Sequence, residues 1–134
     1  MRKYWPAVIA ASLTVATLAG AQQPTQAGAA AAPAADVSVG TGIENRALVG
    51  AAETFPVATG KLFCQSRVSN ASGSEIEHVW YKGDMEMARV KLMVSGSPWR
   101  THSSKNIGED GAGEWRCDVV HDGKVIQSAK FKVE

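Results

Sequence analysis

The chain has 134 residues, with 14 lysines and arginines against 13 aspartates and glutamates, which gives a formal net charge of +1. Without Arg2 and Lys3, which lie in the N-terminal segment described next, 12 basic side chains face 13 acidic ones. Proteins that bind nucleic acid or adhere to an anionic membrane surface carry a clear basic excess. Neither class fits this composition.

The first 21 residues have the three parts of a secretory signal peptide. Met1-Arg2-Lys3 is positively charged, residues 4–21 are mainly apolar, and Ala19-Gly20-Ala21 supplies the small residues before a cleavage point. We therefore predict cleavage after Ala21 and export to the periplasm or the exterior, with no stable membrane span afterwards. The alternative is a retained N-terminal anchor, although this alanine-rich stretch is short and weakly apolar for a span.

Residues 22–35 consist of alanine, glutamine, proline, threonine and glycine. This composition cannot form a packed core, and Pro24 and Pro33 interrupt any helix, so we predict a disordered linker. The remaining 99 residues, 36–134, are enough for one small domain with a single core.

Alternation of apolar and polar residues, which is typical of half-buried strands, recurs through residues 36–134. About seven short strands are expected, with turn residues between them. The alternating stretches are residues 37–43, 62–68, 76–82, 88–94, 99–105, 115–121 and 125–133. This pattern predicts an all-β fold, a single immunoglobulin-like antiparallel β-sandwich.

The strongest turn signal is Asp122-Gly123. A type I′ hairpin turn requires positive φ angles at both central residues, and Asp-Gly meets this requirement well. We predict that this turn joins residues 115–121 to residues 124–133 as an antiparallel pair.

The two cysteines of the chain, Cys64 and Cys117, each lie on the apolar side of a predicted strand, with Trp80 between them in sequence. Two inward cysteines on non-adjacent strands can meet across a sandwich, so we predict a disulfide that joins the two sheets beside Trp80. The alternative is a pair of reduced, buried cysteines that pack as small apolar residues.

Five blocks of the sequence point to a known family. They are Thr-Gly-Ile-Glu-Asn-Arg at 41–46, Leu-Phe-Cys-Gln-Ser-Arg-Val at 62–68, His-Val-Trp-Tyr at 78–81, Trp-Arg-Thr-His-Ser-Ser-Lys at 99–105 and Gly-Glu-Trp-Arg-Cys-Asp-Val at 113–119. Together they resemble the bacterial family called domain of unknown function 2914. The resemblance implies an exported or membrane-attached β domain without an assigned activity. Cys117 stands where that family more usually has an aliphatic residue, which implies that the disulfide is a local addition.

Residues 99–105 form the densest polar and aromatic block of the chain. Alternation places Trp99 and Lys105 on one side of the strand and Arg100 and His102 on the other. One interpretation is a ligand-binding face, with an aromatic platform beside donors for sugar hydroxyls or a carboxylate. The alternative is a strand whose tryptophan fills the core.

Arginines recur on the polar sides of several predicted strands. Cross-strand ion pairs with Asp118 and Glu77 would be the ordinary explanation, and an anion-binding patch is the alternative. We predict that these arginines share one outer face, which serves as the contact surface. The predicted surface consists of Arg67, Tyr81, Arg100 and Arg116.

The sequence has no metal-binding spacing such as Cys-x-x-Cys or His-x-x-x-His among His78, His102 and His121, so we predict neither a metal site nor a cofactor. His78 is instead expected beside Trp80, with its ring nitrogens hydrogen-bonded. No nucleophile elbow, phosphate loop or zincin helix is present, so we do not expect an enzyme. The alternative is a small cell-wall hydrolase that uses Ser103 or Ser104 with His102.

These patterns lead to a hypothesis of function. The chain is interpreted as a non-catalytic, exported interaction module of the bacterial cell envelope. Its partner would be an envelope protein or a cell-wall glycan, and not nucleic acid. A further alternative is a structural component that pairs through strand edges, which an exposed and uncharged edge strand would favour.

Overall fold

The structure, a computed structural model, describes residues 32–134. It contains strands at all seven predicted stretches and three further short strands. Their bounds are β1 (Ala34–Gly40), β2 (Gly42–Glu44), β3 (Ala47–Val49), β4 (Thr54–Phe55), β5 (Lys61–Ser69), β6 (Glu75–Lys82), β7 (Met85–Met93), β8 (Trp99–Asn106), β9 (Gly113–His121) and β10 (Lys124–Val133), with one 3-10 turn at Val57–Thr59.

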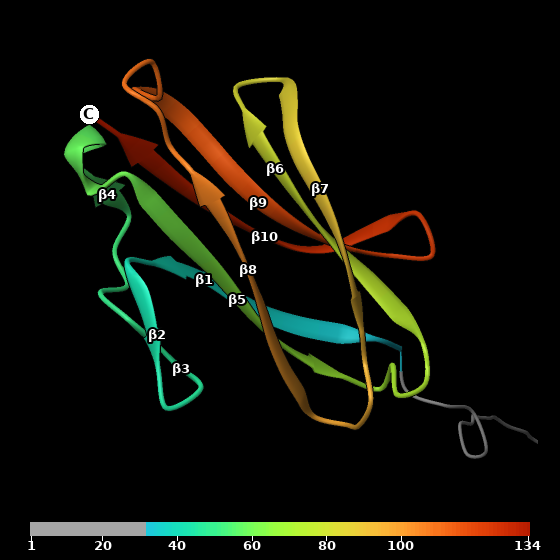
Figure 1. The fold of residues 1–134 in the computed structure, drawn as a ribbon. Coiled ribbons are helices and arrows are strands. Elements are labelled where there is room, and N and C mark those ends of the chain that lie inside the picture. Colours follow the sequence, from blue (N-terminus) through green and yellow to red (C-terminus); the bar gives the residue numbers. More distant parts are fainter. Residues whose placement is uncertain (1–31) are drawn as a thin grey trace, which may run out of the picture. The chain divides into compact units, whose positions relative to one another are not determined.

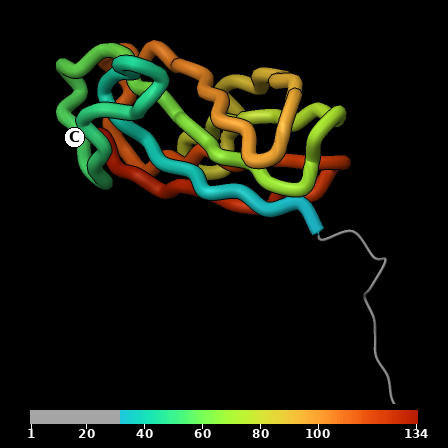
Figure 2. Tube along the Cα trace, turned by 90° about the horizontal axis from the view of Figure 1, so that it is seen from below, coloured from blue at the N-terminus to red at the C-terminus, as the bar shows by residue number. Residues whose placement is uncertain are grey.

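The strands form two face-to-face sheets and a small hairpin (Figure 1). The first sheet has three strands in the order β1-β5-β8, and the second has five in the order β4-β10-β9-β6-β7. Strands β2 and β3 pair only with each other and form the hairpin. Strand β1 also runs alongside β10, so it links the two sheets at one side (Figure 2). This arrangement confirms the predicted immunoglobulin-like sandwich.

Two details at the start of the domain differ from the prediction. Strand β1 begins at Ala34, so the last two residues assigned to the linker lie in a strand and pair with β5. The alternation over residues 37–43 predicts one strand, whereas the chain bends at Thr41 and Ile43 belongs to β2. Residues of β2 are half-buried or exposed, so the apparent continuation of the alternation at Ile43 does not reflect one strand with a buried side.

The core is built around a disulfide between Cys64 on β5 and Cys117 on β9, as predicted. Both cysteines are fully buried, and so is Trp80, which lies opposite Cys117 in the β6–β9 register. The bond therefore joins the middle strands of the two sheets beside a buried tryptophan, which is the arrangement found in immunoglobulin domains.

Four aromatic rings fill the core at one end of the disulfide. Trp115 stacks on Phe131, which meets Trp80 and Phe55 edge-on with ring centroids 6.1 Å and 5.9 Å away. The Trp115 indole also donates a hydrogen bond of 2.6 Å to the Gly111 carbonyl, four residues upstream. Immunoglobulin domains commonly place a tyrosine two residues before the second cysteine with the same kind of upstream bond. Here a tryptophan takes that position.

The hairpin predicted from Asp122-Gly123 joins β9 and β10 as expected. The φ angles are 51° and 76°, both positive as a type I′ turn requires, and His121 lies opposite Lys124 in the register. The hairpin matters for the core because it brings β10, which carries Phe131, beside β9.

The predicted signal peptide, residues 1–21, and residues 22–31 of the predicted linker lie outside the described residues. Among residues 32–134, no helix has the length and apolar character needed to cross a membrane.

Candidate functional site

The four residues predicted to form one contact surface are divided between two faces. Arg67 on β5 and Arg100 on β8 point outward from the three-stranded sheet, because the inward positions of β5 are Cys64 and its alternating neighbours. Tyr81 on β6 and Arg116 on β9 point outward from the five-stranded sheet. The prediction of a single shared face is therefore wrong. Alternation tells which side of a strand a residue occupies, and not which sheet the strand joins.

On the three-stranded sheet, the arginines lie beneath the β2–β3 hairpin. Arg67 and Arg100 are direct cross-strand neighbours in the antiparallel β5–β8 register. The hairpin turn places Arg46 above them, and the Arg46 carbonyl accepts hydrogen bonds from Gln65 Nε2 at 2.8 Å and from Arg100 Nη1 at 3.1 Å. These bonds hold the hairpin against the outer face of the sheet.

The hairpin and the sheet enclose a depression of about 750 Å³, which we call the arginine groove. Its polar lining includes Arg46, Gln65, Arg67, Arg100, Thr101 and His102, and its apolar lining includes Ile43, Met93, Pro98 and Trp99. No salt bridge to a carboxylate of residues 32–134 involves any of its three arginines. Asp36 lies opposite Arg67 in the β1–β5 register and is the nearest acidic neighbour by pairing.

Arg46 is the arginine of this groove that the sequence analysis did not select. Asn45 and Arg46 form the two-residue turn of the β2–β3 hairpin with φ angles of 51° and 68°. A positive φ is uncommon for arginine, so the turn lacks the Asn-Gly or Asp-Gly signal that marks such hairpins. The two strands have three residues each, which is too short for alternation to show.

On the five-stranded sheet, by contrast, the arginines are paired. Arg116 Nε lies 3.0 Å from Asp118 Oδ1, and the guanidinium carbon lies 4.1 Å from the centre of the Tyr81 ring. Ser128 Oγ also donates a hydrogen bond of 2.7 Å to the buried Asp118 carboxylate. Arg116 therefore pairs with a carboxylate, but the pair lies along one strand and is not the cross-strand ion pair that was predicted.

Glu77 pairs with an arginine that the sequence did not single out. Arg89 Nη1 lies 2.7 Å from Glu77 Oε1, and Arg89 Nη2 lies 2.9 Å from Glu86 Oε1. The hydrogen bond from Arg89 lowers the pKa of Glu86 from its ordinary value. This face therefore neutralises its arginines with its own carboxylates.

A buried polar network crosses the middle of the sandwich. His78 is fully buried on β6, and its Nε2 and Nδ1 atoms lie 2.8 Å from Ser66 Oγ and 2.7 Å from Ser103 Oγ. Trp80 Nε1 donates to the same Ser103 hydroxyl at 3.1 Å. The expectation that both ring nitrogens of His78 would be hydrogen-bonded near Trp80 is confirmed. Burial, with a smaller contribution from the charge of His102, lowers the pKa of His78 to about 4, so the imidazole is neutral near pH 7.

The alternative prediction of a hydrolase paired Ser103 or Ser104 with His102, and in the described domain neither serine hydrogen-bonds to His102. Ser103 points inward, is 6% exposed and bonds to His78, whereas Ser104 and His102 lie on the opposite, exposed side of β8. A substrate cannot reach the Ser103 hydroxyl without opening the core. The local alternation of β8 was interpreted correctly, but the partner of Ser103 comes from another strand.

A second serine–histidine contact lies nearer the surface. Ser74 Oγ is 3.2 Å from His121 Nε2, and His121 Nδ1 is 3.8 Å from an oxygen of Asp122. The order resembles a catalytic triad, but the Ser74 hydroxyl donates its proton to the Ala71 carbonyl at 2.5 Å. The Asp122 side chain is 89% exposed and too distant to hydrogen-bond with the imidazole. The Ser74–His121 contact therefore links the turn before β6 to the end of β9, and the Ser74 hydroxyl is not activated as a nucleophile.

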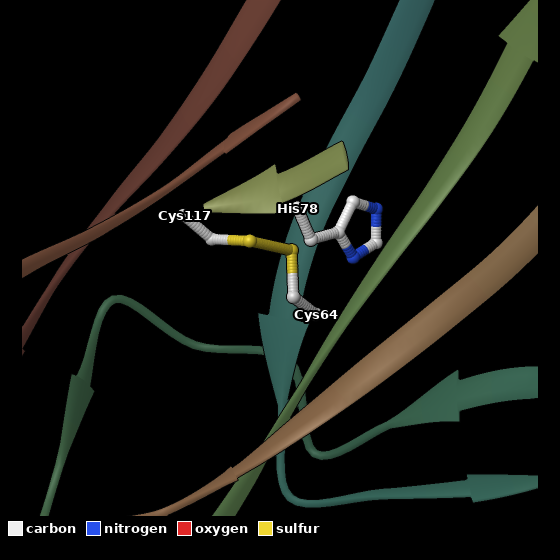
Figure 3. Close-up of side chains that lie close together, drawn as sticks. All are labelled: Cys64, His78 and Cys117. Atoms are coloured by element: carbon white, nitrogen blue, oxygen red, sulfur yellow. A yellow bond between two sulfur atoms is a disulfide. The ribbon is translucent and has the colours of Figure 1, made fainter. Parts of the chain in front are cut away.

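His78 also lies beside the disulfide (Figure 3). A nitrogen of His78 and the two sulfur atoms lie within 4.8 Å of one another, a grouping typical of Cys₂His metal sites. The sulfur atoms are bonded to each other and the imidazole nitrogens contact two serines. A metal needs thiolates and a free nitrogen lone pair, so this oxidised arrangement does not fit one.

The two remaining predicted binding residues lie at opposite ends of β8. Trp99 is half-buried, packs against the core near Val68 and also lines the arginine groove. Lys105 lines a different depression, of about 740 Å³, together with the exposed Met85 and Met87 and the buried Trp115. The structure therefore joins Trp99 to Arg67 and Arg100, and separates Lys105 from them.

The fold defines the chain as an immunoglobulin-like β-sandwich. It is similar to the crystal structure of an immunoglobulin-like protein from Pseudomonas aeruginosa, with a TM-score of 0.54 and 18% sequence identity. The match covers 80% of this chain and 100% of that one, and it supports the fold alone.

Residues 73–133 match the model of a family described as protein of unknown function (DUF2914). This match confirms the predicted family resemblance and includes three of the five blocks, those at 78–81, 99–105 and 113–119. The blocks at 41–46 and 62–68 lie before the matched region. No curated protein matches the sequence.

Proposed function

We propose that the protein is a non-catalytic binding module of the bacterial cell envelope and that the arginine groove is its contact surface. The groove carries this proposal because it combines a concave shape with exposed polar side chains. Arg67, Arg100 and His102 are all exposed within it, and the β2–β3 hairpin forms its wall. Its volume is within the range of sites that bind small molecules or segments of larger partners.

Export is supported by the oxidised state of the core. A disulfide between Cys64 and Cys117 forms and persists in compartments such as the periplasm and is rare in the cytosol. The signal-peptide pattern of residues 1–21 agrees with this assignment. We therefore place the module outside the cytoplasmic membrane, with an envelope protein or a wall glycan as its partner.

A binding role is favoured over catalysis by the two serine–histidine contacts of the described domain. Ser103 is enclosed in the core with His78, and Ser74 directs its proton to a carbonyl. Neither hydroxyl has a base that could accept its proton in contact with a substrate.

Pairing through strand edges has less support. The two edge strands that face one open side of the sandwich are β7 and β8, and both carry charges along their length. Glu86, Arg89 and Lys91 lie on β7, and charged side chains on an edge strand oppose pairing with another chain. The uncharged edge that this alternative requires is therefore lacking on these two strands.

Site-specific photo-crosslinking in the producing cells tests the proposal. A photoreactive residue is placed at Ser38 or Ser104, which are exposed on the outer face of the three-stranded sheet, and at Lys91 or Lys130 on the opposite face as controls. We expect adducts from the first pair and none from the second. Loss of the added mass after protease treatment would identify a protein partner, and loss after muramidase treatment would identify wall glycan. Adducts from the control face alone, or from no position, would overturn the proposal.

A further inference from the structure

We infer that the arginine groove recognises an oxyanion, a carboxylate or phosphate group, held between Arg67 and Arg100. The inference rests on the proposed binding function and specifies the chemical group that the groove takes. It starts from the β5–β8 register, in which Arg67 and Arg100 are direct neighbours. Like charges directly opposite each other in a sheet are destabilising, and Asp36, the acidic residue on the other side of Arg67, forms no salt bridge with it, so a bound anion would relieve the repulsion of this pair.

The arginines on the two outer faces of the sandwich differ in their salt bridges, and only those of the groove lack a carboxylate partner in the described domain. On the five-stranded sheet, Arg89 contacts two carboxylates and Arg116 contacts one. On the three-stranded sheet, none of the arginines at 46, 67 and 100 forms a salt bridge to a carboxylate of the described domain. The groove therefore presents guanidinium groups whose ionic interactions the domain itself does not satisfy.

The hairpin orients these donors. Arg100 uses one Nη1 hydrogen bond to reach the Arg46 carbonyl, which fixes its guanidinium and leaves further N–H groups for a ligand. Gln65 holds the same carbonyl from the neighbouring position on β5. A planar guanidinium can bind a carboxylate or a phosphate through two parallel hydrogen bonds, which a lysine cannot reproduce.

Two acidic residues lie near enough to the groove to be considered as partners of its arginines. Asp36 lies opposite Arg67 on β1, and Glu44 lies beside the hairpin turn on β2; both are exposed. Neither forms a salt bridge with an arginine of the groove. Together they leave an excess of positive charge among the groups around the groove.

Two sources supply the same chemistry, and the assay separates them. Oligogalacturonate carries carboxylates on sugar rings, polyphosphate carries phosphates, and a neutral chitin oligomer carries neither. Binding of each probe to the purified protein is measured by titration calorimetry at low and moderate salt. We expect the neutral oligomer not to bind. We expect at least one polyanion to bind, with an affinity that falls about tenfold or more as salt rises.

Variants with matched charge make the test specific. R67Q/R100Q removes two positive charges from the groove, and K91Q/K124Q removes two exposed charges outside it. We expect the first variant to bind the polyanion at least tenfold more weakly and the second to stay within about twofold. Equal losses in the two variants would overturn the inference, because they would indicate attraction by net charge alone. R67K/R100K keeps the two positive charges but replaces the planar guanidinium groups, which can form two parallel hydrogen bonds, with ammonium groups. We expect this variant to bind the polyanion severalfold more weakly than the wild type.

Stability provides a separate readout. The double variant also loses the Arg100 hydrogen bond to the Arg46 carbonyl, so the repulsion is tested with R67Q alone, which keeps that bond. Because Arg67 and Arg100 repel each other, R67Q should unfold at a temperature no lower than the wild type. A clearly lower unfolding temperature of R67Q would mean that Arg67 stabilises the fold, and it would overturn the inference. If the wild type crosslinks to an envelope partner through the groove and R67Q/R100Q crosslinks equally well, the oxyanion inference fails and the binding function remains. If no envelope partner is found but the polyanion binding requires both arginines, the binding function fails and the oxyanion site remains.

Discussion

The buried His78 should make the stability of the domain depend on pH. Its pKa is lowered from 6.5 to about 4, mainly because burial disfavours the charged imidazolium. In the unfolded chain the same residue is exposed and takes up a proton near its ordinary value. Between pH 6.5 and pH 4 the unfolded state therefore binds more protons than the folded state, and the free energy of unfolding falls as the pH falls through this window.

The magnitude follows from the two pKa values. At about 1.4 kcal/mol per pKa unit, the difference between 6.5 and about 4 corresponds to about 3 kcal/mol of stability. The full contribution is present above pH 6.5 and is lost on approaching pH 4. A domain of this size typically has about 5–15 kcal/mol of stability in total, so the effect is large enough to measure.

The variant H78Q removes the titrating group and keeps an amide that can contact the hydroxyls of Ser66 and Ser103. H102Q, at an exposed position on β8, removes only the smaller contribution to the lowered pKa and should keep most of the pH dependence. Urea unfolding followed by tryptophan fluorescence at pH 7.5, 6, 5 and 4 gives the free energy of unfolding of each protein. We expect the wild type to lose about 3 kcal/mol more than H78Q between pH 7.5 and pH 4. Parallel pH profiles of the wild type and H78Q would refute the reasoning, since carboxylates titrate alike in both.

Three further predictions concern the core and a turn. Removing the disulfide with C64A/C117A should lower the free energy of unfolding by about 4 kcal/mol, because the bond closes a loop across a sequence separation of 53; a loss below about 1 kcal/mol in urea unfolding would contradict this chain-entropy estimate. Trp115→Phe keeps an aromatic ring but leaves the Gly111 carbonyl without its donor, so we expect a loss of about 1–3 kcal/mol. Unchanged unfolding would show that this bond contributes little. Gly123→Ala places a side chain at a φ of 76° and should cost about 1–2 kcal/mol; calorimetric melting checks this, and an unaltered melting temperature would count against a strained turn.

Features that depend on adjacent or alternating residues could be predicted from the sequence, and features without such a local pattern could not. The Asp122-Gly123 hairpin was predicted because its turn chemistry lies in two adjacent residues. The inward orientation of Cys64 and Cys117 was predicted because a strand alternates with a period of two. By contrast, the β2–β3 hairpin was missed, since its strands are too short to alternate and its turn has an arginine where glycine is usual.

The candidate site shows the same division. Arg67 and Arg100 were selected from the sequence as outward residues, and the structure places them side by side. Arg116 was grouped with them because it has the same local pattern, yet its strand lies in the other sheet. Adjacency in sequence predicts His102 as the partner of Ser103, whereas the contact comes from His78 across the sandwich.

The sequence by itself determined the all-β class, the orientation of the two cysteines, the β9–β10 turn and the family resemblance, because each depends on local spacing or on the identity of neighbouring residues. The tertiary structure alone decided which outward arginines share a face, that Arg46 closes a groove above two of them, and that His78 lies beside the disulfide with its ring nitrogens on two serines. These features depend on how strands are ordered in the sheets and on how the sheets stack. Strand order is set by long-range pairing between segments far apart in the chain, and a period of two along one strand carries no information about it.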